Sequence, residues 1–101
     1  MKVLHLLKST IYSGAENVVL TIIELFPEIE MVYASPDGPI RKVVEGRGYS
    51  FYPLEVASAK AVKKAIAEVK PDLIHAHDFC MASYAAWTAG KIPVVAHLHN
   101  N

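Results

Sequence analysis

The chain has 101 residues, which is the size of a single domain. Hydrophobic residues make up 52% of it and charged residues 20%, so it can bury a core and disorder is not expected. Ten basic and ten acidic side chains balance, which argues against the clustered basic surface of a nucleic-acid-binding protein. The single cysteine, Cys80, cannot form an internal disulfide and fits a reducing compartment.

The opening residues do not have the pattern of a targeting or membrane segment. Their apolar run is a few residues long and is interrupted by Lys8. A signal peptide needs a longer apolar region with a small-residue cleavage site, and a membrane span needs about 20 apolar residues. We therefore expect a cytoplasmic chain.

Short apolar runs alternate with segments of helical spacing. The runs predict strands at 3–7, 31–35, 49–54, 73–77 and 93–98. The segments between them predict helices at 15–26, 39–46, 59–70 and 79–89. Ser58 is the expected N-cap of the third helix. The fourth is apolar nearly all round, so we expect it to be well buried with Phe79, Tyr84 and Trp87 in the core.

This alternation predicts the fold class. Strands that are almost continuously apolar, each followed by a helix, indicate a parallel sheet covered on both faces. With right-handed crossovers the result is an α/β doubly wound, Rossmann-like fold of about five strands in the order 3-2-1-4-5. Residues 1–101 would form one domain. A loop and a helix should follow the fifth strand in this architecture, so we expect the domain to be truncated there.

The strand order predicts where a ligand would bind. Ligands of open parallel sheets bind beyond the carboxyl ends of the strands, where the strand order reverses. That point lies between the first and fourth strands. The loop 8–14 and the turn at 77–78 should meet there, with 97–101 as the next neighbour.

The loop after the first strand supplies the first candidate residues. It lacks both the dinucleotide fingerprint and the Gly-Lys-Ser/Thr of a P-loop. It places Gly14 at a helix start, where free N–H groups and the helix dipole favour an anionic or polyhydroxyl ligand. Ser13 and Glu16 also have the spacing of a capping box. These residues are therefore candidates both for ligand binding and for capping the helix.

Histidines supply the second set of candidates. His75 and His77 should share one face of the fourth strand, as should His97 and His99 on the fifth, with Asp78 beside them. Two such pairs could ligate zinc. Because neighbours on one strand face are ~7 Å apart, they chelate poorly, and we expect no metal. We expect His75 to be a hydrogen-bonded core residue and His77 and His99 to contact a ligand through neutral imidazole.

Three segments, taken in order, resemble the N-terminal domain of retaining glycosyltransferases of family 4, which have the GT-B fold. Segment 3–16 is similar to the family's first strand and its Gly-Gly-Ala-Glu loop, with Ser13 in place of the first glycine. Segment 71–77 is similar to the motif Pro-Asp-hydrophobic-hydrophobic-His-x-His. Segment 93–100 is similar to the family segment that ends in His followed by Asp or Asn. The final His-Leu-His-Asn-Asn also resembles members that build capsular polysaccharides and exopolysaccharides.

The resemblance implies a two-domain enzyme that moves a sugar, with retention, from a nucleotide-sugar donor to a glycan or lipid-linked acceptor. It implies no metal or other cofactor and no nucleic acid. His99 would be the catalytic residue near the donor sugar. The substrate-binding residues would be Ser13, Gly14, Glu16, His77 and Asn100. The C-terminal nucleotide-sugar domain is absent from this sequence, so we expect the fragment alone to be inactive.

The same resemblance bears on location and partners. The complete enzyme would be cytoplasmic and would contact the inner face of the membrane peripherally, while the uncovered edge of the sheet offers a surface for self-association. Two alternatives stay open. One is a stand-alone flavodoxin-like binding or regulatory module, and the other is a metal-binding module built on the histidine pairs.

Overall fold

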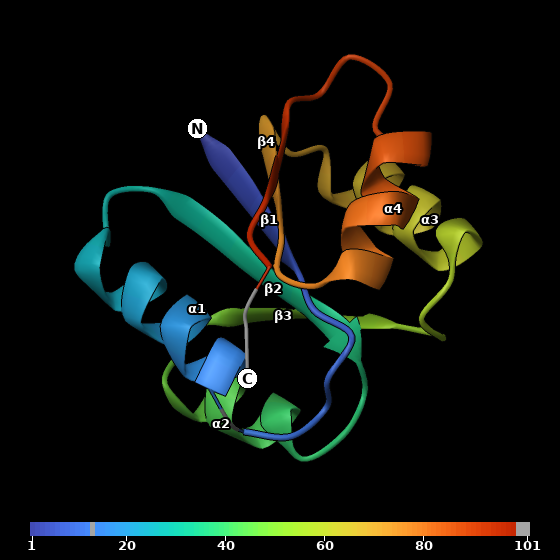
Figure 1. Ribbon diagram of the computed structural model, residues 1–101. Helices are drawn as coiled ribbons and strands as arrows, with labels where there is room; N and C mark the ends of the chain where they lie inside the picture. The colour runs from blue at the N-terminus through green and yellow to red at the C-terminus, as the bar shows by residue number, and fades with distance from the viewer. Residues whose placement is uncertain (13, 99–101) are drawn as a thin grey trace.

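The computed structural model describes residues 1–12 and 14–98 of the chain. Within these residues the strands of one parallel sheet alternate with helices along the chain (Figure 1). The elements in chain order are β1 (Lys2–Leu6), α1 (Gly14–Leu25), β2 (Glu30–Pro36), α2 (Ile40–Gly46), β3 (Ser50–Leu54), α3 (Ala59–Val69), β4 (Leu73–Ala76), α4 (Phe79–Thr88) and β5 (Val94–Ala96).

The sheet has the order β3-β2-β1-β4-β5, and every pair of neighbouring strands is parallel. The predicted fold class and strand order are therefore confirmed. The central strand β1 pairs with β2 along one edge and with β4 along the other, so the strand order reverses at β1. This reversal places the carboxyl ends of β1 and β4 side by side.

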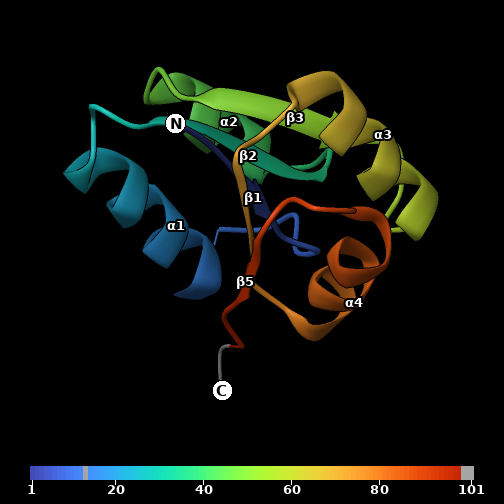
Figure 2. The same ribbon diagram turned by 90° about the horizontal axis from the view of Figure 1, so that it is seen from above.

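Two helix layers cover the sheet, one on each face (Figures 1 and 2). The helices α1 and α2 pack over Val3 of β1, Tyr33 of β2 and Leu7, which directly follows β1; all three have odd numbers and share one face of the sheet. The helices α3 and α4 pack over Leu4 and Leu6 on the even-numbered side. Because side chains alternate along a strand, each central strand contributes to both cores.

Local capping explains where two of the helices begin. Ser58 precedes α3 with extended backbone, and its hydroxyl accepts from the N–H of Ala61 at 3.1 Å, which confirms the predicted cap. Asp78 is the N-cap of α4, and its carboxylate accepts a hydrogen bond from the N–H of Met81 at 2.8 Å. Both bonds satisfy N–H groups that have no partner within the first helical turn.

The prediction of a well-buried α4 is wrong. Phe79 and Trp87 are 73% and 82% exposed, and Tyr84 is half-buried. The helix meets the sheet along a single stripe that contains Met81 and Ala85, four residues apart. An apolar composition therefore did not mean burial on every side, because one layer of sheet can cover one stripe of a helix.

The fifth strand is also shorter than the predicted 93–98. It covers three residues and pairs with β4 through Ile74 opposite Val94 and Ala76 opposite Ala96. Val95, on the other face, is 47% exposed. None of the helices formed by residues 1–12 and 14–98 has both the length and the apolar character needed to cross a membrane.

Candidate functional site

A pocket of about 820 Å³ lies at the carboxyl ends of β1 and β4, where the strand order reverses. Its walls come from the loop that follows β1, from the start of α1 and from the start of α4. The lining residues that matter for the chemistry are Lys8, Gly14, Glu16, His77, Asp78 and Cys80. The pocket thus collects polar groups from segments that are about 70 residues apart in the chain.

Asp78 fastens two walls of the pocket together. One carboxylate oxygen, Oδ1, accepts from the N–H of Met81, and the other, Oδ2, accepts from the backbone N–H of Lys8, both at 2.8 Å. The N–H of His77 also donates to the carbonyl of Leu6 at 3.0 Å. These bonds hold the loop after β1 against the first turn of α4.

The far side of the same loop is anchored at Thr10. Its carbonyl accepts from the N–H of Ile40 at 2.9 Å. Gly38 approaches Thr10 so closely that a Cβ on this glycine would lie 2.6 Å from the Thr10 Cβ. A side chain at Gly38 would therefore push the loop, and glycine is needed here for close approach of backbone to side chain.

Gly14 begins α1 and borders the pocket. It is exposed, and a Cβ added to it would meet nothing within 4 Å. Its backbone therefore does not require glycine for packing. The open space beside it would let a ligand come close to the helix start, where backbone N–H groups and the helix dipole attract negative or hydroxyl-rich groups.

Glu16 is 1% exposed although it stands in the first turn of a helix that faces solvent elsewhere. It borders the pocket together with His77. Burial, and after it the negative charge of Glu16, raise the pKa of Tyr33 well above its ordinary value. The hydroxyl of Tyr33 has no hydrogen-bond partner among the described residues. The side chains of Glu16, Tyr33 and His77 therefore contribute polar groups to the buried region under α1.

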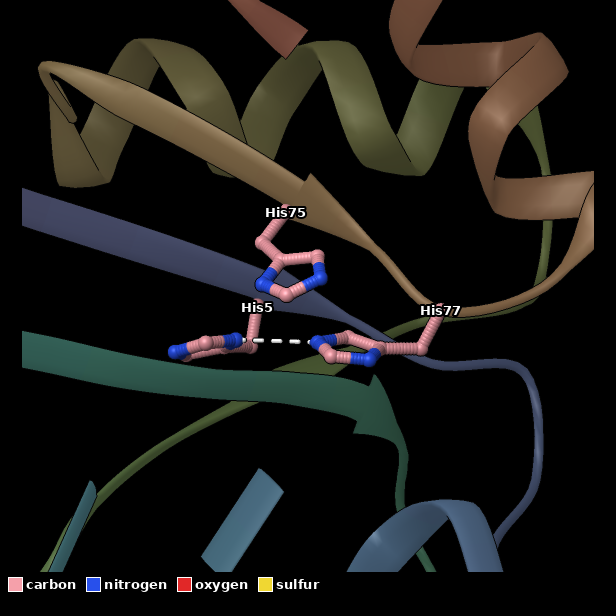
Figure 3. A group of neighbouring side chains, drawn as sticks. All are labelled: His5, His75 and His77. Atoms are coloured by element: carbon pink, nitrogen blue, oxygen red, sulfur yellow. Dashed lines mark hydrogen bonds between the residues drawn. The ribbon is translucent and has the colours of Figure 1, made fainter. Parts of the chain in front are cut away.

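Three histidines lie behind the pocket and point toward one another (Figure 3). His5 and His75 are register partners on β1 and β4, so their side chains share one face of the sheet. The Nδ1 of His5 lies 3.0 Å from the Nε2 of His77, and its Nε2 lies 3.2 Å from the sulfur of Met31. Burial, and after it the nearby His75, lower the pKa of His5 to about 3. His5 is therefore neutral at physiological pH.

The histidine trio does not have the geometry of a metal site. One ring nitrogen from each of His5, His75 and His77 lies within 4.8 Å of the others. However, the rings of His75 and His77 are stacked, with centroids 3.9 Å apart and planes inclined by 28°. The lone pairs of an imidazole lie in the ring plane, and planes arranged this way do not meet at the bond length of about 2 Å that zinc requires. Both rings would have to turn before they could share an ion.

The structure brings together three of the predicted site residues, Gly14, Glu16 and His77, around one pocket. His77 is 2% exposed and forms part of the pocket floor. His97 is exposed, and its ring centroid lies 5.9 Å from that of His75. Three further predicted residues lie outside the described part of the chain, namely Ser13, His99 and Asn100.

Sequence reasoning did not single out His5. It stands in the middle of an apolar strand, where a histidine looks like an isolated core residue. The strand order 3-2-1-4-5 contains the missing signal, because it makes β1 and β4 neighbours and so places His5 next to His75. Asp78 stands beside His77 in the sequence, but its double contact with Lys8 and Met81 depends on a loop conformation that spacing does not reveal.

Two solved structures share the fold of this chain. Anabaena HepE, whose crystal structure holds UDP and glucose, aligns with a TM-score of 0.82 and 22% identity over 99% of this chain and 30% of its own. A glycosyltransferase from Rickettsia africae aligns with a TM-score of 0.72 and 14% identity over 94% of this chain and 28% of its own. The chain therefore spans less than a third of either protein.

No curated protein matches the sequence. A family model, by contrast, matches residues 12–101, which include the helices α1 to α4, the strands β2 to β5 and the pocket residues Gly14, Glu16 and His77. Its description agrees with the resemblance of the three motif segments and with the printed description of the Rickettsia protein. The chain belongs to Glycosyltransferase Family 4.

Proposed function

We propose that this chain is the incomplete N-terminal, acceptor-side domain of a retaining GT-B glycosyltransferase. The complete enzyme would move a sugar from a nucleotide-sugar donor to a glycan or lipid-linked acceptor in capsular, exopolysaccharide or cell-surface glycan synthesis. The observation that carries the proposal is the pocket of a family 4 chain in which Gly14, Glu16 and His77 meet at the switch point of a parallel sheet. The UDP and glucose in the Anabaena structure support a nucleotide-sugar donor.

The residues around the pocket have distinct parts in this proposal. Ser13 and Gly14 would let the donor phosphates approach the N–H groups at the start of α1, because Gly14 leaves open space beside the backbone. Glu16 and His77 would contact sugar or acceptor hydroxyls from the pocket floor. His99 would be the catalytic residue at the donor sugar, with Asn100 binding substrate beside it.

A second domain is part of the proposal. Residues 1–101 correspond to 30% of Anabaena HepE, and the nucleotide-binding residues would lie on a C-terminal domain that closes over the pocket. The present chain would then be inactive alone. The complete enzyme would work in the cytoplasm at the inner face of the membrane, and the exposed edge at Val95 would be covered by further chain or by a second copy.

Two experiments test the proposal. The first is to sequence the gene beyond the codon for Asn101. A stop codon at that point would contradict the proposal of a second domain. The second is to assay transfer from labelled nucleotide sugars by the complete polypeptide. We expect His99→Ala to abolish transfer while circular dichroism stays native. His97→Ala is the matched control, because His97 belongs to the same segment, is exposed and should leave transfer intact. Unchanged turnover in His99→Ala would refute the catalytic role.

A further inference from the structure

A second pocket, of about 930 Å³, lies between the edge strand β3 and the helix α3. Among the described residues it shares no lining residue with the pocket at the ends of β1 and β4. Its walls come from the carboxyl ends of β2 and β3, from the segment that follows β3 and from α3. The apolar part of the lining includes Tyr52, Pro53, Leu54, Val56 and Ala61. The pocket can therefore hold a ligand that has an apolar part.

Three lysines of α3 stand on the rim of this pocket, namely Lys60, Lys63 and Lys64. All three are exposed, and none of them forms a salt bridge with any of residues 1–12 and 14–98. Lys60 is three and four residues away from the other two, a spacing at which like charges on a helix repel each other. Lys60 also stands in the first turn of α3, near the positive end of the helix dipole. The rim therefore carries positive charge that the helix itself does not neutralise.

The acidic side chains near the pocket leave this charge in excess. Asp37 borders the pocket but is paired with Arg41 at 2.8 Å. Glu68 of α3 accepts a hydrogen bond from the hydroxyl of Tyr52. Within the described part of the chain, Glu55 is then the only carboxylate of the lining without such a partner, and the three lysines outnumber it. An anionic ligand would supply the missing negative charge.

We propose that this pocket binds an anionic amphiphile, that is, a molecule with a phosphate head and an apolar part. The phosphate would meet the ammonium groups of Lys60, Lys63 and Lys64, and the apolar part would contact Tyr52 and Val56. Val56 supports this assignment because it borders the pocket and is 56% exposed although it is apolar. A small inorganic anion would satisfy the lysines but leave the apolar wall in water. The site does not depend on the proposed glycosyl transfer.

Titration of ¹⁵N-labelled protein tests the proposal on the present chain. Dihexanoyl phosphatidic acid, kept below its micelle concentration, should shift the amide resonances of Val56 and Ala61 and reach saturation. Dihexanoyl phosphatidylcholine has the same tails with a zwitterionic head, and inorganic phosphate has the charge without the tails. Both should bind about tenfold more weakly or worse, because each lacks one half of the interaction. Equal affinity for either compound would overturn the proposal, as would the absence of a saturable shift with phosphatidic acid.

Substitution of the rim lysines tests the place of binding. In Lys63→Gln/Lys64→Gln the affinity for dihexanoyl phosphatidic acid should fall about tenfold, because hydrogen bonds from charged donors are lost. The fold should be retained, since the change reduces repulsion along α3. Lys42→Gln/Lys91→Gln is the matched control, because both lysines are exposed, lie outside the pocket and give the same change in net charge. An equal loss of affinity in the control would indicate general attraction to a basic protein and contradict the site.

Two further measurements test the apolar wall and identify the source of the ligand. Val56→Ser should weaken the binding of phosphatidic acid and leave that of inorganic phosphate unchanged; unchanged binding of phosphatidic acid would contradict the amphiphile. Co-sedimentation with phosphatidylcholine vesicles, with and without phosphatidic acid, follows. Binding to the anionic vesicles that is lost in Lys63→Gln/Lys64→Gln would identify the ligand as a membrane lipid. Binding of monomeric phosphatidic acid without co-sedimentation would identify it as a soluble amphiphile in the same pocket.

Discussion

The backbone N–H of Lys8 donates to Oδ2 of Asp78 across 70 residues of sequence, while Oδ1 of the same carboxylate caps α4 at Met81. One side chain therefore joins the loop after β1 to the helix after β4. The position of one pocket wall relative to the other depends on this carboxylate. The two functions can be separated because each uses a different oxygen.

Asp78→Ser should retain the cap of α4 and lose the bond to Lys8. We expect a loss of about 1 kcal/mol in the free energy of unfolding, because a net hydrogen bond contributes about that much. Amide exchange should accelerate at Lys8 and stay slow at Met81. Ser58→Ala is the control, since it removes the cap of α3, at a similar cost of about 1 kcal/mol, away from the pocket. Equal acceleration at Lys8 in both variants would contradict the role of Asp78.

Gly38→Ala should displace the loop that borders the pocket. The new Cβ would lie 2.6 Å from the Cβ of Thr10, so either the loop or the start of α2 must move. We expect destabilisation of about 1–3 kcal/mol, the usual cost of overpacking, with shifted resonances around Thr10. Gly46→Ala is the control for a glycine-to-alanine change without a clash, because a Cβ there meets nothing within 4 Å. That control should be neutral or slightly stabilising, as alanine favours helix.

Gly14→Ala should separate folding from ligand binding. Because a Cβ at Gly14 meets nothing within 4 Å, the free energy of unfolding of the isolated chain should not fall. In the complete enzyme the same methyl group would occupy the space proposed for the donor phosphates, so the KM for the nucleotide sugar should rise about tenfold, equivalent to about 1.4 kcal/mol. An unchanged KM would show that the donor does not approach this backbone.

Tyr33→Phe should not destabilise the protein. The Tyr33 hydroxyl is buried and has no hydrogen-bond partner in the described part of the chain, so removing it relieves a desolvation cost of about 1 kcal/mol or more. Tyr52→Phe provides the contrast, because the hydroxyl of Tyr52 donates to Glu68 and its loss should cost up to about 1 kcal/mol. Chemical denaturation of both variants makes the comparison. Destabilisation by Tyr33→Phe would indicate a water held between Tyr33 and Glu16.

Acidification should destabilise the fold through His5. Its pKa falls from 6.5 to about 3 on folding, so below pH 6.5 the unfolded chain binds a proton that the folded chain excludes. Above pH 6.5 His5 does not lower the free energy of unfolding. Between pH 6.5 and about pH 3, this free energy should fall by about 1.4 kcal/mol for each pH unit because of His5. In His5→Asn this slope should be smaller. An identical pH profile in the variant would assign the acid sensitivity to other groups.

The strands and their order could be predicted because the information is local. Runs of apolar residues mark each strand, and parallel connectivity with right-handed crossovers then leaves few arrangements. The exposure of Trp87 could not be predicted in this way. Composition shows that α4 is apolar, but which of its sides meets the sheet depends on the crossover that follows β4.

The site was predictable to the extent that it depends on strand ends. The switch point places Gly14 and His77 together because the loop that leads to Gly14 follows β1 and His77 directly follows the neighbouring strand β4. The burial of Glu16 was not predictable, since the spacing Ser-x-x-Glu equally indicates a solvent-exposed cap. The contact of His5 with His77 depends on register, which sequence periodicity alone does not determine.

The separation of the two sheet faces has a consequence for folding. In the native pairing His5 lies opposite His75 and Leu4 opposite Ile74. A slip of β4 by one residue would turn His75 and His77 into the hydrophobic layer beneath α3 and α4, where imidazoles would lose their polar neighbours. The incorrect alignment is therefore penalised by His75 and by His77, and His77 also lines the pocket. We therefore expect His75 and His77 to disfavour a shifted register of β4 whatever ligand the pocket binds.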